Sequence, residues 1–145
     1  MIFEAKFFDK LTTTELYEII KSRTEVFMLE QNIICQDLDD VDYVSLHCFI
    51  REGKRVTAYL RAFADKENDD AVTVGRVLTL VHGKGAGTIL MKKSMEEIKQ
   101  KFKCKKINLH AQKRAMEFYE KLGFITVSDE FREEGVVHVS MEREI

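Results

Sequence analysis

The sequence has 145 residues, the length of one ordinary domain, and a formal net charge of −2 at pH 7. Acidic and basic residues are interspersed, so no basic stripe indicates a nucleic-acid-binding protein. No apolar run approaches the roughly 18 residues that span a bilayer, and residues 1–11 alternate apolar and charged side chains, unlike a signal peptide. We therefore expect one domain over residues 1–145, soluble in the cytoplasm, with neither nucleic acid nor membrane as a partner.

The three cysteines and the absence of proline give further information about the protein's compartment and its turns. Cys35, Cys48 and Cys104 are far apart in the sequence, and none has the spacing of a metal ligand pair. We therefore expect free thiols in a reducing compartment and no metal site. Proline is absent, so the turns must depend on Gly, Asn and Asp.

The first half of the chain predicts a strand, a helix and three further strands. Residues 2–7 are rich in apolar side chains that alternate with charged ones, which is typical of a strand. Thr12 and Glu15 have the spacing of a capping box, which predicts a helix that ends near residues 30–32. The three strands that follow are predicted at residues 44–51, 55–63 and 72–80.

The second half alternates helices with strands. A helix at residues 85–101 places Met91 and Met95 on one apolar face. A second helix, at residues 114–122, ends at Gly123, which suits the left-handed conformation there. The strands around these helices are predicted at residues 105–110, 124–127 and 136–141. This order predicts an α/β fold, a mixed central sheet with crossover helices.

A glycine-rich stretch, His82-Gly83-Lys84-Gly85-Ala86-Gly87-Thr88, lies between the central strand and the helix after it. The first turn of a helix has unpaired N–H groups, and glycine lets the backbone approach phosphate oxygens closely. An anion-binding loop and a simple tight turn both fit this pattern. A P-loop needs a hydroxyl residue directly after its lysine, and a dinucleotide fingerprint follows the first strand, so both fit poorly.

Two motifs in the right order make the sequence similar to the GNAT superfamily of acyl-CoA N-acyltransferases. Its phosphate loop, Gln/Arg-x-x-Gly-x-Gly/Ala, is matched in spacing by residues 82–87. Its motif Asn-x-x-Ala-x-x-Phe-Tyr-x-x-x-Gly-Phe is matched by Gln112, Ala115, Phe118, Tyr119, Gly123 and Phe124. The sequence resembles the ElaA-like branch at residues 131–141 and at Arg23, Phe27, Glu30, Gln31, Asp37, Asp39, Asp42 and His47. The resemblance covers nearly the whole chain and implies strands splayed around the cofactor.

The resemblance also implies a reaction. A primary amine of a small molecule or peptide attacks the thioester of acetyl-CoA directly, and Tyr119 protonates the leaving thiolate. A backbone N–H of the central strand stabilises the developing oxyanion. Dimers are common in the family, so a homodimer is among the assemblies expected. The coenzyme A contacts implied are Val77, Leu78, Thr79, His82, Gly83, Lys84, Gly85, Ala86, Gly87, Thr88, Gln112 and Tyr119.

The residues on the acceptor side are less defined. The central strand has no acidic residue, so His110 and His47 are the candidates for the base that takes the amine proton. Either histidine also fits a satisfied structural role, and Tyr119 also fits a packing aromatic. The substrate contacts implied are Glu30, Gln31, Arg76 and His47, with Arg76 orienting a carboxylate of the substrate or of the protein.

Three further questions stay open at this level. The acidic loop with Asp37, Asp39 and Asp42 fits either an attractor of amines or a solvated loop. His82 and Gln112 replace the usual family residues. This substitution motivates an alternative to the acetyltransferase, a non-catalytic acyl-CoA-binding or sensor module that acts on a protein partner. A nucleotide enzyme that uses the same loop for ATP is the third candidate.

Overall fold

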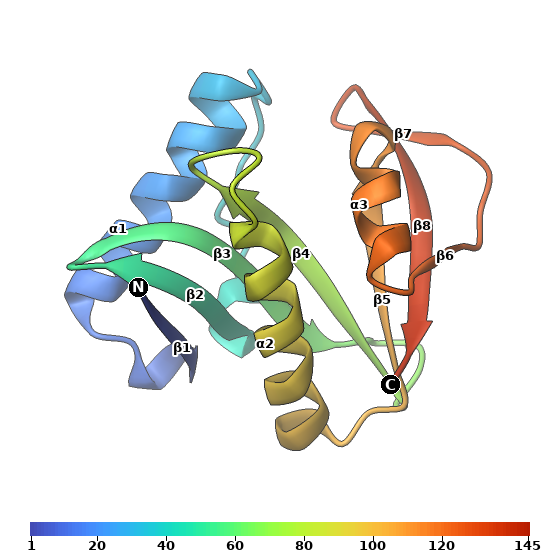
Figure 1. The fold of residues 1–145 in the computed structure, drawn as a ribbon, viewed down its shortest axis with the longest axis horizontal. Coiled ribbons are helices and arrows are strands. Elements are labelled where there is room, and N and C mark those ends of the chain that lie inside the picture. Colours follow the sequence, from blue (N-terminus) through green and yellow to red (C-terminus); the bar gives the residue numbers. More distant parts are fainter.

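The computed structural model describes all residues, 1–145, and it has one eight-stranded sheet (Figure 1). The strand order is β1-β2-β3-β4-β5-β8-β6, and β7 pairs with β8. Only β4 and β5 pair in parallel; the other neighbours are antiparallel. The strands are β1 (Ile2–Phe7), β2 (Leu46–Glu52), β3 (Arg55–Ala64), β4 (Ala71–Thr79), β5 (Lys106–Gln112), β6 (Ile125–Thr126), β7 (Phe131–Glu133) and β8 (Val136–Glu144). The predicted mixed α/β sheet is confirmed.

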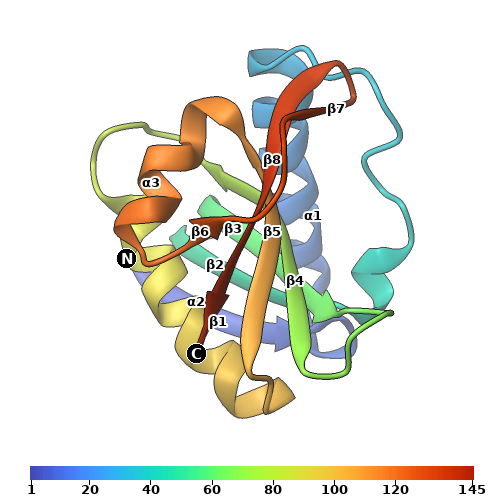
Figure 2. The ribbon, with the colours of Figure 1, turned by 90° about the vertical axis from the view of Figure 1, so that its right-hand side faces the viewer.

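Three α-helices cover the sheet, with α2 and α3 on one face and α1 on the other (Figure 2). The larger apolar core lies under α2 and includes Leu90, Met91 and Ile98. A smaller core lies under α1, around Ile19 and Tyr59. The helices are α1 (Thr13–Arg23), α2 (Ala86–Phe102) and α3 (Met116–Lys121), with a π-helical segment η2 (Thr24–Glu30) and short 3₁₀ turns η1 (Phe8–Lys10), η3 (Val41–Val44) and η4 (Lys113–Ala115).

Local sequence signals explain where the helices begin and end. Thr12 and Glu15 form both bonds of the predicted capping box at the start of α1. The helix continues beyond Arg23 as η2, so its end at Glu30 agrees with the prediction although its last turns are π-helical. Gly123 follows α3 with φ +89°, and a Cβ there would lie 2.9 Å from the Arg143 side chain. This position therefore requires glycine.

The sheet opens between its two halves. Backbone pairing of β4 with β5 covers only four residue pairs, from Ala71–Lys106 to Val74–Leu109. Beyond these pairs the strands diverge, and Figure 1 shows them together at one end and far apart at the other. The pairing of β4 with β3 also shifts register there, from Arg61–Gly75 to Tyr59–Leu78. This bulge leaves one extra residue in β4, where Arg76 has a φ of +54°.

Strand β7 and the 3₁₀ turns were not predicted. The three-residue strand β7 forms a hairpin with β8 through the turn residues Glu134 and Gly135, which both have positive φ. The three cysteines are free thiols, as expected; Cys48 and Cys104 are buried. No helix in the structure is long and apolar enough to cross a membrane.

Candidate functional site

A cavity of about 1080 Å³ occupies the opening between β4 and β5. Its walls come from both halves of the sheet, from the end of η2, from the start of α2, and from α3 with the β7–β8 turn. Of the residues predicted for the site, only His47 does not line this cavity. The residues that it brings together are Glu30, Gln31, Arg76, Val77, Leu78, Thr79, His82, Gly83, Lys84, Gly85, Ala86, Gly87, Thr88, His110, Gln112 and Tyr119.

The glycine loop closes one end of the cavity and leads into α2. Gly83 and Gly85 have φ of +76° and +80°, conformations that glycine adopts without strain. Gly85 is the N-cap of this 17-residue helix and has no side chain to satisfy the first N–H groups. A Cβ at Gly87 would lie 3.2 Å from the Phe118 ring, so glycine also lets α3 approach the loop. The loop therefore presents free N–H groups at the positive end of a helix.

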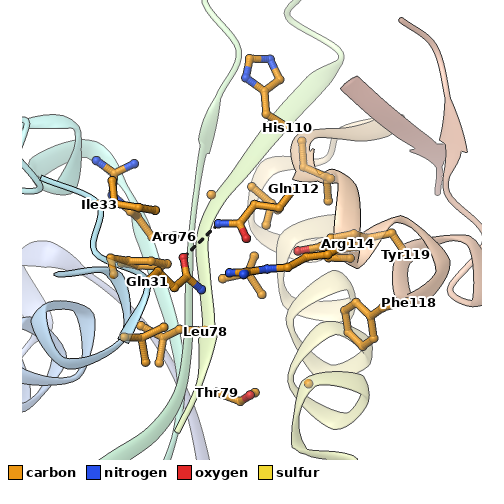
Figure 3. Close-up of a pocket in the computed structure, with 18 of the residues that line it drawn as sticks. Gln31, Ile33, Arg76, Leu78, Thr79, His110, Gln112, Arg114, Phe118 and Tyr119 are labelled. Carbon is orange, nitrogen blue, oxygen red and sulfur yellow. Dashed lines mark hydrogen bonds between the residues drawn. The ribbon is translucent and has the colours of Figure 1, made fainter. Parts of the chain in front are cut away.

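Two consecutive residues at the end of η2 reach across the cavity. Glu30 contacts His82 at 2.6 Å between Oε1 and Nε2, and both side chains are exposed. Gln31 accepts a 3.0 Å hydrogen bond from the amide of Gln112 at the end of β5. Figure 3 shows this bond bridging the two halves of the sheet, with Arg114, Phe118 and Tyr119 on the side of η4 and α3. The positions where this chain departs from the GNAT motifs are therefore both held by η2.

Tyr119 is both packed and directed to the site. It is only 7% exposed, and it meets Phe118 and Phe124 edge-on at ring distances of 5.0 and 5.8 Å. It also lines the cavity, and no charged group is paired with it. Burial raises the pKa of Tyr119, so the phenol keeps its proton at neutral pH.

The carboxylates of the acidic loop are paired with arginines. Arg23 donates to Asp37 at 2.9 Å and to Asp42 at 2.6 Å. Arg61 binds Asp39 through two bonds, at 2.6 and 2.7 Å. Arg76 also donates to Asp37, at 2.8 Å. We name these three arginines and three aspartates the Asp–Arg network. The three carboxylates are therefore not free to attract an amine, because each is paired with an arginine, although the Asp39 side chain stays 33% exposed.

The Asp–Arg network also shows which carboxylate Arg76 contacts. The carboxylate that Arg76 orients belongs to the protein, at Asp37, and a second contact joins it to Asp39 at 3.4 Å. The bond from Arg61 is the main cause that lowers the pKa of Asp39 to about 2. Burial alone would raise the pKa of Asp42, but the hydrogen bond from Arg23 and the nearby charges lower it.

His47 is a satisfied core histidine. Only 1% of it is exposed, and its Nδ1 lies 2.7 Å from the Tyr59 hydroxyl. Its Nε2 lies 2.9 Å from the carbonyl oxygen of Asp42, so Nε2–H donates and Nδ1 accepts. Burial lowers the pKa of His47, which keeps the ring neutral. The expected substrate contact and base role of His47 are corrected, because both ring nitrogens are used inside the protein.

His110 has the opposite environment. It directly follows Leu109, the last residue of β5 that pairs with β4, so it lies where the two halves of the sheet begin to separate. Its side chain is 53% exposed and lines the cavity. Its Nδ1 lies 3.0 Å from Glu133 Oε1, on the strand that the sequence did not predict. The sequence analysis gave Glu133 no role, although Glu133 lies in the ElaA-like stretch 131–141 and directly before the Glu134–Gly135 turn.

Comparison with known proteins gives consistent matches. Residues 41–145 match the model of the Acetyltransferase (GNAT) domain. Protein ElaA of Escherichia coli K12 is 31% identical over 140 residues, 94% of this chain and 92% of ElaA. UPF0039 protein C11D3.02c of Schizosaccharomyces pombe is 33% identical over 99% of this chain and 97% of its own. Crystal structures of E. coli ElaA and of an acyl-CoA N-acyltransferase from Pseudomonas aeruginosa, 29% and 28% identical, superpose with a TM-score of 0.91 over 99% of both chains.

Proposed function

Because this chain belongs to the GNAT acetyltransferase family and is ElaA-like, we propose that it is an N-acetyltransferase that uses acetyl-CoA. Acyl transfer from coenzyme A follows from the family. The acetyl group, the acceptor (a primary amine of a small molecule or peptide) and the residue roles are our proposal. One observation carries it: a single cavity joins an anion-binding loop, a buried phenol and an accessible imidazole.

The residues at the loop end of the cavity suit coenzyme A. The free N–H groups from Gly83 to Thr88 would bind the pyrophosphate, and Lys84 would add a positive charge. Arg114, which sequence reasoning also missed, adds a second cation on the same cavity. Gln112 and the backbone of Val77 and Leu78 would hold the pantetheine arm, whose thioester supplies the activated acyl group.

Tyr119 and His110 have environments that suit opposite proton transfers. The phenol of Tyr119 keeps its proton and can give it to a leaving thiolate. The imidazole of His110 lines the cavity just beyond the last β4–β5 pair, where it would meet an amine that enters from the side away from the glycine loop. We propose that His110 takes the amine proton, because the alternative histidine, His47, is closed to substrate.

Calorimetric titration with acetyl-CoA tests the binding half of the proposal, with Gly85→Ala as the variant. A Cβ at φ +80° strains the loop by about 1–2 kcal/mol, so we expect affinity to fall about tenfold. Gly53→Ala is the matched control, since Gly53 has φ +59° in the β2–β3 turn, away from the cavity. Absence of binding to the parent protein at millimolar acetyl-CoA would reject the proposal, and tight ATP binding that excludes acetyl-CoA would favour the nucleotide enzyme.

A coenzyme A release assay over polyamines, amino acids, aminoglycosides, sugars and peptide N-termini tests the catalytic half. The parent protein should release coenzyme A with at least one amine class. Tyr119→Phe should lower kcat by about tenfold or more while leaving acetyl-CoA affinity unchanged, because only the donated proton is lost. An unchanged kcat rejects Tyr119 as the acid. Acetyl-CoA binding without product from any amine favours the non-catalytic sensor module.

A further inference from the structure

Glu133 and His110 form a hydrogen-bonded pair at the open end of the cavity. The carboxylate of Glu133 only accepts hydrogen bonds, so the 3.0 Å contact to His110 Nδ1 requires the proton to be on Nδ1. The lone pair of a neutral His110 is then on Nε2. Neutral imidazole in water favours the opposite form, with the proton on Nε2. The pair therefore selects the tautomer that leaves Nε2 free to accept a proton.

The strand register places Glu133 on the correct face. Thr73 donates to Asn108 across β4 and β5, so Asn108 and, two residues on, His110 project from the same face of the sheet. Phe131 pairs with His138, and Glu133 pairs with Val136, in the two-residue hairpin of β7 and β8. His138 also pairs with Gln112, two residues from His110, so Glu133 lies on the same side of the sheet as His110.

A second histidine and an aromatic ring surround this pair. His138 Nδ1 lies 2.7 Å from the carbonyl oxygen of Val136, so Nδ1–H donates, and its Nε2 lies 3.6 Å from Glu133 Oε2, beyond hydrogen-bond distance. Phe131 stacks on His138 and meets His110 edge-on at 5.1 Å. Glu133 thus contacts one imidazole through each oxygen, and Phe131 packs against both rings.

We propose that Glu133 is the positioning residue for the base, an inference that rests on the proposed role of His110. It fixes the imidazole in the Nδ1–H form, and the protonated amine gives one proton to His110 Nε2 while the Nδ1 proton stays hydrogen-bonded to Glu133. The amine lone pair so released attacks the acyl carbonyl. Glu133 itself touches neither reactant and exchanges no proton.

Imidazole ¹H–¹⁵N correlation spectra of the neutral rings test the tautomer directly, since the chain has only four histidines. The expected protonated nitrogens are Nδ1 in His110 and His138, and Nε2 in His47. In Glu133→Ala, His110 should change to mainly Nε2–H, while His47 should not change and so reports that the protein is folded. A parent His110 that is mainly Nε2–H, or one unaltered by Glu133→Ala, overturns the inference without touching the proposed function.

Steady-state kinetics with the best amine from the panel provide the second readout. Glu133→Ala should lower kcat about 10- to 100-fold, as loss of an orienting partner typically does, with no change in KM for acetyl-CoA. Glu133→Gln offers an amide that can accept or donate, so its kcat should follow the measured fraction of Nδ1–H. Glu130→Ala is the control, since Glu130 pairs with Lys113 outside the cavity and should change nothing. A tautomer change without loss of kcat rejects the positioning role; an unaffected kcat in His110→Ala rejects the base instead.

Discussion

The Asp–Arg network and the His110–Glu133 pair are both clusters of charged or titratable groups beside one cavity. They differ in how exposed they are and in which polar atoms lack a protein partner. In the network every carboxylate has an arginine, and Arg23 is only 1% exposed. In the pair both side chains are about half exposed, and Nε2 of His110 has no protein partner. The paired carboxylates hold the loop of residues 37–42 in place, and the one unpartnered atom of the network, Arg61 Nε, is buried. The unpartnered Nε2 of His110 belongs to an exposed side chain and is available for chemistry.

The largest effect should come from breaking the Asp–Arg network. Arg23→Ala leaves Asp37 and Asp42 without their shared partner, so we expect the free energy of unfolding to fall by about 3–5 kcal/mol in urea titration. Arg55→Ala, which removes an exposed pair with Glu25, should cost less than about 1 kcal/mol. Similar losses in both variants would contradict the distinction between the two kinds of ion pair.

Removing the imidazole of His110 should affect rate rather than stability. His110→Ala should lower kcat by about 100-fold or more, because the amine loses its proton acceptor, while thermal stability and acetyl-CoA affinity stay as in the parent protein. His47→Gln should show the reverse, a loss of about 1–3 kcal/mol in the free energy of unfolding with kcat retained in the folded fraction. If the two histidines exchanged these effects, the assignment of the base would fail.

The network should also appear in the pH dependence of stability. The pKa of Asp39 is lowered from 3.8 to about 2 in the folded protein, chiefly by the hydrogen bond from Arg61. A carboxyl with a lowered folded pKa stabilises the fold above its unfolded pKa, and this contribution is lost as pH falls through the folded pKa. Urea titrations between about pH 4 and 2 should therefore show declining stability, and Asp39→Asn should flatten the decline. An unaltered slope in that variant would reject the contribution of Asp39.

The smallest effect should come from the exposed pair of His82 and Glu30. Surface ion pairs contribute about 0–1 kcal/mol, and the backbone of the loop is expected to provide most of the binding. His82→Ala should therefore change acetyl-CoA affinity by less than about threefold in calorimetry. A larger loss would mean that the side chain, and not the loop backbone, holds the cofactor.

Most of the fold could be predicted from the sequence because most helices and strands are marked by residues within or next to them. The capping box at Thr12, the apolar face of α2 and Gly123 each act within a few residues, and each was predicted correctly. The strand β7 was missed because three residues, Phe-Arg-Glu, are too few to show alternation.

The site could be predicted only in part, because many of its contacts join residues far apart in the sequence. The glycine loop is contiguous, so its position and conformation could be anticipated. Glu133 meets His110 across 23 residues, and Arg61 meets Asp39 across 22, so only the tertiary structure reveals these contacts. His47 and His110 look alike in sequence, and their difference depends on burial, which is a property of the whole fold.

The four-pair parallel contact between β4 and β5 has a consequence for motion. Because so few backbone hydrogen bonds join the two halves of the sheet, the opening angle between them is expected to be among the softest coordinates of the molecule. A ligand seated in the cavity contacts both halves at once and would act as a wedge that fixes this angle. Amide exchange at Val72 to Val74 should then slow when the cavity is filled, and it would measure how tightly the two halves move as one body.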